Sequence, residues 1–89
     1  MSKYRPISVE VAAPITSGAA ITVSDANVVR ATNTAGTTAY LVSLVNDADE
    51  VVSSMTLVPL EVALIDKPKG WKVFAANASV KLVSVTYPS

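Results

Sequence analysis

The sequence lacks cysteine and histidine, and it has only three glycines. Without cysteine the chain has no disulfide framework and no thiolate metal site. Without histidine it has no Ser–His–Asp triad, no histidine general base and no histidine ligands for zinc. Three scattered glycines do not make a glycine-rich phosphate loop. These absences exclude the most common catalytic and cofactor-binding arrangements, and we expect no cofactor.

The chain also lacks an excess of charge of either sign. Seven basic residues balance seven acidic ones, so the formal net charge is zero. Nucleic-acid binders usually need a basic excess to displace counterions from phosphates, and anionic membranes attract the same kind of surface. No apolar run is long enough to span a bilayer, and residues 1–11 lack the apolar segment of a signal peptide. We therefore expect neither a nucleic-acid partner nor a membrane partner.

The composition is instead rich in apolar residues. Hydrophobic residues make up 51% of the chain and charged residues only 16%, against roughly 25% charged in an average domain. A domain of 89 residues has a large surface for its volume and cannot bury every apolar side chain. The surplus either faces other protein subunits, which we favour, or is scattered singly over the surface, where apolar residues are normal.

Strand-like segments recur along the whole sequence. Fifteen valines and many threonines favour strands, because stiff β-branched side chains fit a pleated surface. Alternation of apolar and polar residues, interrupted by turn signals, predicts an all-β fold. We expect an N-terminal arm of residues 1–6, then a single small antiparallel β-sandwich or jelly-roll-like domain over residues 7–89. Its seven to eight short strands should lie within residues 7–11, 20–24, 28–34, 37–45, 51–57, 60–66, 71–76 and 79–87.

Turn residues mark the boundaries between these strands. Asn33 and Gly36 tolerate positive φ and are expected in one turn, and Pro59 is expected at a corner or sheet edge. The segment "SDANVVRAT", which begins at Ser24, could start a helix, but its many valines favour a bend.

The acidic loop holds Asp47, Asp49 and Glu50. Oxygen ligands at alternating positions could hold calcium, but the loop lacks the glycine and the downstream glutamate of a full calcium loop. A solvated turn is favoured, and no metal is expected. We also expect no enzymatic activity, because no two acids are placed to face one cleft and no serine or threonine has an evident base.

The stretch "EVALIDKPKGWKVFAAN" combines most of the lysines with the only tryptophan. Pro68 and Gly70 predict a tight hairpin turn. Trp71 either fills the open end of the sandwich or belongs to a contact patch, since tryptophan is enriched at interface hot spots. The residues that we expect at a protein interface are Tyr4 and Arg5 of the arm, and Lys67, Lys69, Trp71 and Lys72 of this loop.

The last third, "SSMTLVPLEVALIDKPKGWKVFAANASVKLVSVTYPS", resembles small all-β structural proteins of tailed bacteriophages. In those chains an apolar strand passes through a corner to a second strand that ends in an acid–lysine pair. A short turn follows, then "vfAa" and a Val-rich strand that closes on a tyrosine. The upstream segment "VVRATNTAGTTAYLVSLVNDADEVVSSMTL" also looks like their central hairpins. Trp71 departs from the pattern, which usually has a polar residue there. The matching positions are 56–57, Pro59, 62–67, 73–76 and 83–87.

The resemblance implies a virion component that is assembled in the host cytoplasm. It implies a capsid decoration (cement) protein first, with a tail or neck piece as the alternative. Its partners would be the major capsid protein or other virion proteins, and it would act as a homo-oligomer or in many copies. A carbohydrate- or receptor-binding β module is a further alternative, although such sites usually offer several exposed aromatics.

Overall fold

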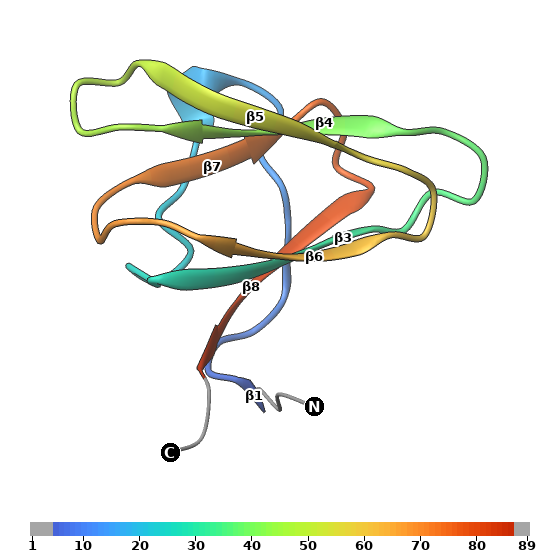
Figure 1. Cartoon of the computed structure of the whole chain (residues 1–89), viewed down its shortest axis with the longest axis horizontal. Helices are drawn as coiled ribbons and strands as arrows, with labels where there is room; N and C mark the ends of the chain where they lie inside the picture. Colours follow the sequence, from blue (N-terminus) through green and yellow to red (C-terminus); the bar gives the residue numbers. More distant parts are fainter. Residues whose placement is uncertain (1–4, 87–89) are drawn as a thin grey trace.

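The computed structural model describes residues 5–86, and within them the chain is all-β. Two antiparallel sheets face each other as a small sandwich (Figure 1), as the sequence predicts. The larger sheet has the order β1-β8-β3-β6, with β2 also paired to β8, and the smaller sheet has the order β5-β4-β7. The strands are β1 (Arg5–Pro6), β2 (Val11–Ala12), β3 (Val28–Asn33), β4 (Tyr40–Val45), β5 (Val51–Leu57), β6 (Val62–Asp66), β7 (Lys72–Ala75) and β8 (Val80–Thr86).

Strand β3 organises the larger sheet, because it pairs with β8 on one side and β6 on the other. Its residues alternate between half-buried and fully buried, as the period of two in a strand requires. Val29 and Ala31 point into the core, where Leu82 of β8 and Val73 of β7 also lie. The core therefore consists mainly of valine and alanine side chains, and the sandwich is thin.

The expected strand at residues 20–24 is wrong. Ile21 forms only an isolated bridge to Val73, and the chain then enters a left-handed turn. Val23, Ser24 and Asp25 have φ values of 53°, 58° and 59°. Val23 is buried in the core. The alternation at these positions thus reflects burial of apolar side chains without a continuous ladder of main-chain hydrogen bonds. The bend expected around Ser24 is confirmed.

The N-terminal segment also has less strand than expected, because β2 covers only the end of the predicted strand at residues 7–11. Arg5 and Pro6, which the sequence assigns to an arm, pair with Thr86 and Val85 of β8. The main-chain nitrogen of Ile7 continues this contact by donating to the oxygen of Ser84 at 2.9 Å. The other arm residue expected at an interface, Tyr4, lies outside the described residues.

The turn expected around Asn33 and Gly36 has a different physical basis. Neither residue adopts a positive φ. Asn33 is the last residue of β3, and its side chain is fully buried. Pro59 lies as expected at a corner, in the turn that carries the chain from β5 to β6. There Leu60 takes a φ of 65°, and the Glu61 carboxylate accepts a hydrogen bond from the Val58 nitrogen at 2.9 Å.

Candidate interaction surface

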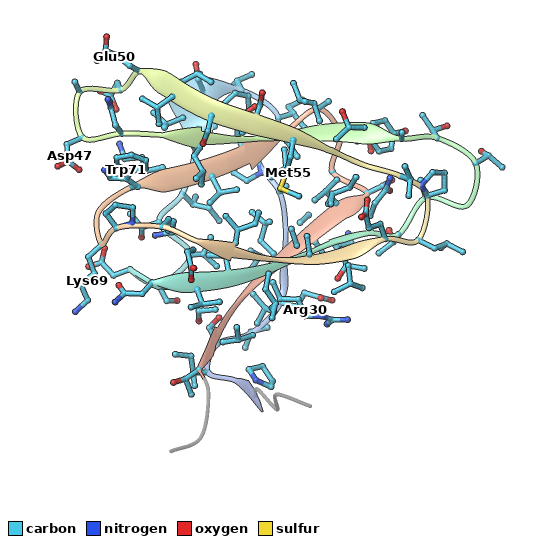
Figure 2. The ribbon with its side chains drawn as sticks, in the orientation of Figure 1. Arg30, Asp47, Glu50, Met55, Lys69 and Trp71 are labelled. Atoms are coloured by element: carbon cyan, nitrogen blue, oxygen red, sulfur yellow. The ribbon has the colours of Figure 1, made fainter. Side chains whose placement is uncertain are left out.

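Two loops of opposite charge meet at one end of the sandwich (Figure 2). The acidic loop between β4 and β5 contacts the lysine-rich connection between β6 and β7. Lys72 Nζ lies 3.2 Å from Asp49 Oδ1. A Cβ at Gly70 would lie 3.3 Å from Asp47 Oδ1, so the Asp47 side chain lies against the main chain of Gly70. Two of the charges that stand out in the sequence, on Lys72 and Asp49, are therefore paired within the domain.

The segment from Lys67 to Trp71 is not the hairpin turn that the sequence predicts. Its flanking strands belong to different sheets, since β6 pairs with β3 and β7 pairs with β4. A tight turn is nevertheless present, because the Trp71 nitrogen donates to the Pro68 oxygen at 3.2 Å. Gly70 takes a φ of 89°, a value that glycine adopts readily and that suits its predicted place in a turn. The connection thus crosses from one sheet to the other.

The three lysines of this connection have different environments. Lys69 is exposed, and Lys72 pairs with Asp49. Lys67 is 4% exposed, and its Nζ has no hydrogen-bond partner among the described residues. Burial lowers the pKa of Lys67, and the charge of Asp25 opposes this only in part. Of the expected lysine patch, only Lys69 thus offers a free ammonium group to a partner.

Trp71 lies between the acidic loop and β7 in Figure 2. It is half-buried. Among the described residues, the half-buried side chains that pack against the core are Ile21, Tyr40, Leu44 and Ala63, and Trp71 is not one of them. Trp71 therefore lies outside the main core cluster. That Trp71 belongs to a protein interface stays a prediction. The same holds for the two arm residues and the three lysines.

Asn46 holds the acidic loop in its conformation. Its Oδ1 accepts hydrogen bonds from the main-chain nitrogens of Ala48 and Glu50 at 2.9 and 3.0 Å. The three acids expected here, Asp47, Asp49 and Glu50, are exposed, and within residues 5–86 no three acidic side chains gather as a metal-ligand set. The loop has the geometry of a solvated turn.

A second surface lies on the open side of the sandwich, along the edge strands β5 and β6. Figure 1 shows β5 in front of β4 and β6 in front of β3. Every residue of β5 except Leu57 is exposed. The large apolar side chains that are 40% exposed or more on these two strands are Val51, Val52, Met55, Val62 and Leu64. Apolar exposure is therefore gathered along both edges as well as scattered elsewhere.

An apolar groove separates the two edge strands. It has a volume of about 170 Å³ and is lined by Val42, Leu44, Ser53, Ser54, Met55 and Ile65. Register places Ser53 beside Leu44 and Met55 beside Val42, so both residues belong to the inner face of the smaller sheet. Figure 2 shows Met55 pointing from β5 into the space between the sheets. The core is thus accessible at this side.

The sequence did not identify this surface, although one signal was available. The segment "VVSSMTL" is free of charge, proline and glycine, which suits a buried central strand as well as an unprotected edge. Only the strand order distinguishes the two cases, because it leaves one side of β5 unpaired.

Comparison with protein-family models, curated proteins and solved structures gives no match. Across residues 5–86, no helix is long and apolar enough to cross a membrane.

Proposed function

We propose that this chain is a non-enzymatic structural protein of a virion, a capsid decoration protein that binds the shell through protein–protein contacts. The observation that carries the proposal is the free edge of β5 beside an apolar groove. Such an edge presents unpaired main-chain donors and acceptors, and the groove presents apolar surface. Contact with another protein would pair these main-chain groups and bury this apolar surface.

Burial of this surface supplies the binding free energy. Each 100 Å² of apolar surface removed from water contributes about 2.5 kcal/mol before the costs of association. A single contact of this size is weak, but many copies on one shell add their contributions. A decoration protein stabilises a capsid in this way, by bridging neighbouring subunits.

The sequence resemblance supports the same function. Most of the residues that carry it fall on β5 to β8 and the corner between β5 and β6. Lys67 and Ala76 directly follow β6 and β7, and Tyr87 lies outside the described residues. The full set is 56–57, Pro59, 62–67, 73–76 and 83–87. Two of these strands, β5 and β6, are the edges of the open side. The charged loop contributes less to the proposal, because Lys67 is buried and Lys72 is paired with Asp49.

Purified virus particles whose genome encodes this chain test the proposal. An antibody raised against the purified chain should label the capsids of intact particles by immunogold electron microscopy, and mass spectrometry should find the chain in many copies per particle. Labelling confined to tails or necks would replace capsid decoration by a tail or neck function. Absence of the chain from washed particles would exclude a virion function altogether.

A further inference from the structure

We infer that the β5 edge binds β5 of a second copy of this chain. The two strands would pair antiparallel about a twofold axis through Ser54 and join the smaller sheets into one sheet of order β7-β4-β5-β5-β4-β7. The inference rests on the proposed function and gives the β5 edge to a neighbouring copy on the same shell, which leaves the other exposed apolar residues for contact with the capsid. It is tested in solution without particles, so the two proposals can fail separately.

The β5 edge is the longest unprotected edge among the described residues. The outer side of β8 is covered by β1 and β2, and the free side of β7 contacts residues 14–21 through Pro14 and Ile21. Natural edge strands are commonly protected by charge, proline or short length. β5 has seven residues and neither charge nor proline, and the irregularity in its pairing with β4 is confined to its start, between Val51 and Ser53. A strand of this kind favours pairing with another strand.

Strand β6 also has a free edge, but it suits self-pairing less well. It has five residues and ends in Asp66. Antiparallel self-pairing of its whole length would place that carboxylate opposite Val62 of the second copy. Self-pairing of β5 places no charge in the contact, so the uncharged strand favours a second copy on β5.

The register follows from strand length. A pairing centred on Ser54 aligns the whole of β5 with β5 of the second copy, Val51 opposite Leu57, and keeps the register shift between Ser53 and Val51 near the two ends of the ladder. It also keeps the inner faces of both strands on the same side, because paired residues point to the same face of a sheet. Ser54, which lies beside Ser43 on the outer face, is then opposite Ser54 of the second copy.

In this register, Ser53 lies opposite Met55 of the second copy on the inner face. Ser53 is small and lines the groove, and Met55 is long and 41% exposed. Methionine side chains are flexible and fill irregular gaps. Each copy therefore provides one methionine and one groove, which is the reciprocal complementarity that a twofold contact requires.

The size of the contact sets its strength. One strand pair with one methionine contact on each side buries less than the roughly 800 Å² per partner of a standard stable interface. We therefore expect a dissociation constant on the order of micromolar or weaker in solution. Copies held side by side on a surface would pair more completely, because their effective concentration is much higher.

Sedimentation velocity of the purified chain over a range of concentrations measures the dissociation constant of the dimer. Ser54→Lys and Ser54→Glu should each weaken dimerisation at least tenfold, because each places two like charges opposite each other. An equimolar mixture of the two variants should restore dimers. The matched control Thr37→Lys, in the exposed loop between β3 and β4, should dimerise like the unmodified chain.

A crosslink tests the register directly. The chain has no cysteine, so Ser54→Cys introduces its only thiol. Residues directly opposite in an antiparallel pair have Cα atoms about 4.5–5.5 Å apart, which suits a disulfide. Mild oxidation should give disulfide-linked dimers of Ser54→Cys and few of Thr37→Cys. A chain that stays monomeric at all concentrations would overturn the inference, as would dimers that both Ser54 charge variants leave unchanged.

Discussion

The side chain of Asn33 joins the two sheets, because its Nδ2 donates to the main-chain oxygen of Leu57 at 3.0 Å. The same nitrogen lies 2.9 Å from the oxygen of Thr38, and Oδ1 accepts from the nitrogen of Ala35 at 3.0 Å. Asn33 ends β3 of the larger sheet and Leu57 ends β5 of the smaller one. One carboxamide thus pairs with the buried Leu57 oxygen and with two partly buried main-chain groups, of Thr38 and Ala35.

Replacing Asn33 should therefore strongly destabilise the fold. We expect Asn33→Leu to lower the free energy of unfolding by about 2–4 kcal/mol, because it leaves buried main-chain groups unpaired. Urea unfolding followed by circular dichroism measures this. Asn77, whose Oδ1 accepts a single hydrogen bond among residues 5–86, from the Ser79 nitrogen, provides the control. Asn77→Ala should cost less than about 1 kcal/mol, and equal costs for the two variants would contradict the special role of Asn33.

Gly70 should tolerate substitution poorly. Its φ of 89° is unfavourable for residues with a Cβ, and an added Cβ would lie 3.3 Å from Asp47 Oδ1. We expect Gly70→Ala to lower the free energy of unfolding by about 1 kcal/mol or more. Gly36 has no positive φ and open space around its Cβ position, so Gly36→Ala should be neutral or slightly stabilising. Thermal unfolding of the two variants makes the comparison, and a Gly70→Ala variant as stable as Gly36→Ala would contradict the turn geometry.

Lys67 should make the stability depend on pH in the alkaline range. Its pKa is lowered in the folded state, first by burial, so the unfolded chain binds more protons between the folded pKa and the ordinary value of 10.5. Stability contributed by this group therefore rises as pH increases through that window and is lowest below it. We expect Lys67→Met to remove this dependence and to raise the free energy of unfolding at neutral pH by about 1 kcal/mol.

Urea midpoints of the two proteins, measured from pH 7 to pH 10.5, check this expectation. Lys69→Met provides the control, since Lys69 is exposed. It should leave the slope with pH unchanged. A Lys67→Met variant that is less stable than the unmodified chain at pH 7 would indicate that the buried ammonium group is favourably paired.

The left-handed turn offers a way to stabilise the protein. Ser24 is exposed and has a φ of 58°, which costs a residue with a Cβ about 1 kcal/mol relative to glycine. Ser24→Gly should raise the free energy of unfolding by about 0.5–1 kcal/mol. Thr37→Gly, at an exposed loop position without positive φ, should lower it slightly through the entropy of the unfolded chain. Differential scanning calorimetry measures both, and a destabilised Ser24→Gly variant would contradict the turn.

Local patterns predict the core strands well. β3 to β8 fall within or close to the expected ranges, because each has enough alternation or apolar length to show in sequence. In β4 the two-residue period places Tyr40, Val42 and Leu44 on the inner face, whereas Leu41 on the other face is 44% exposed. Residues 7–25 are predicted less well. There Ile21 and Val23 are partly or fully buried without lying in a strand, so periodicity alone gives a false strand.

For the candidate surfaces, the difference between what the sequence predicts and what the structure shows is larger than for the strands. The charge of the loop from Lys67 to Lys72 is plain in sequence, but Asp49, which pairs with Lys72, lies 23 residues away along the chain. Sequence spacing gives no information about such contacts. Lys67 looks like a surface lysine until the strand period is extended past Asp66, which places it on the inner face with Ile65.

The sequence by itself determined the all-β class, the position of most strands, the turn at Gly70 and the absence of thiol and imidazole chemistry. These features depend on residue types and on the two-residue period of a strand, which are local. The tertiary structure alone decided the strand order, which leaves β5 at an edge, opens the groove beside Ser53 and buries Asn33 between the sheets. Strand order depends on pairing between distant segments, and the same uncharged segment is compatible with a central strand or an edge.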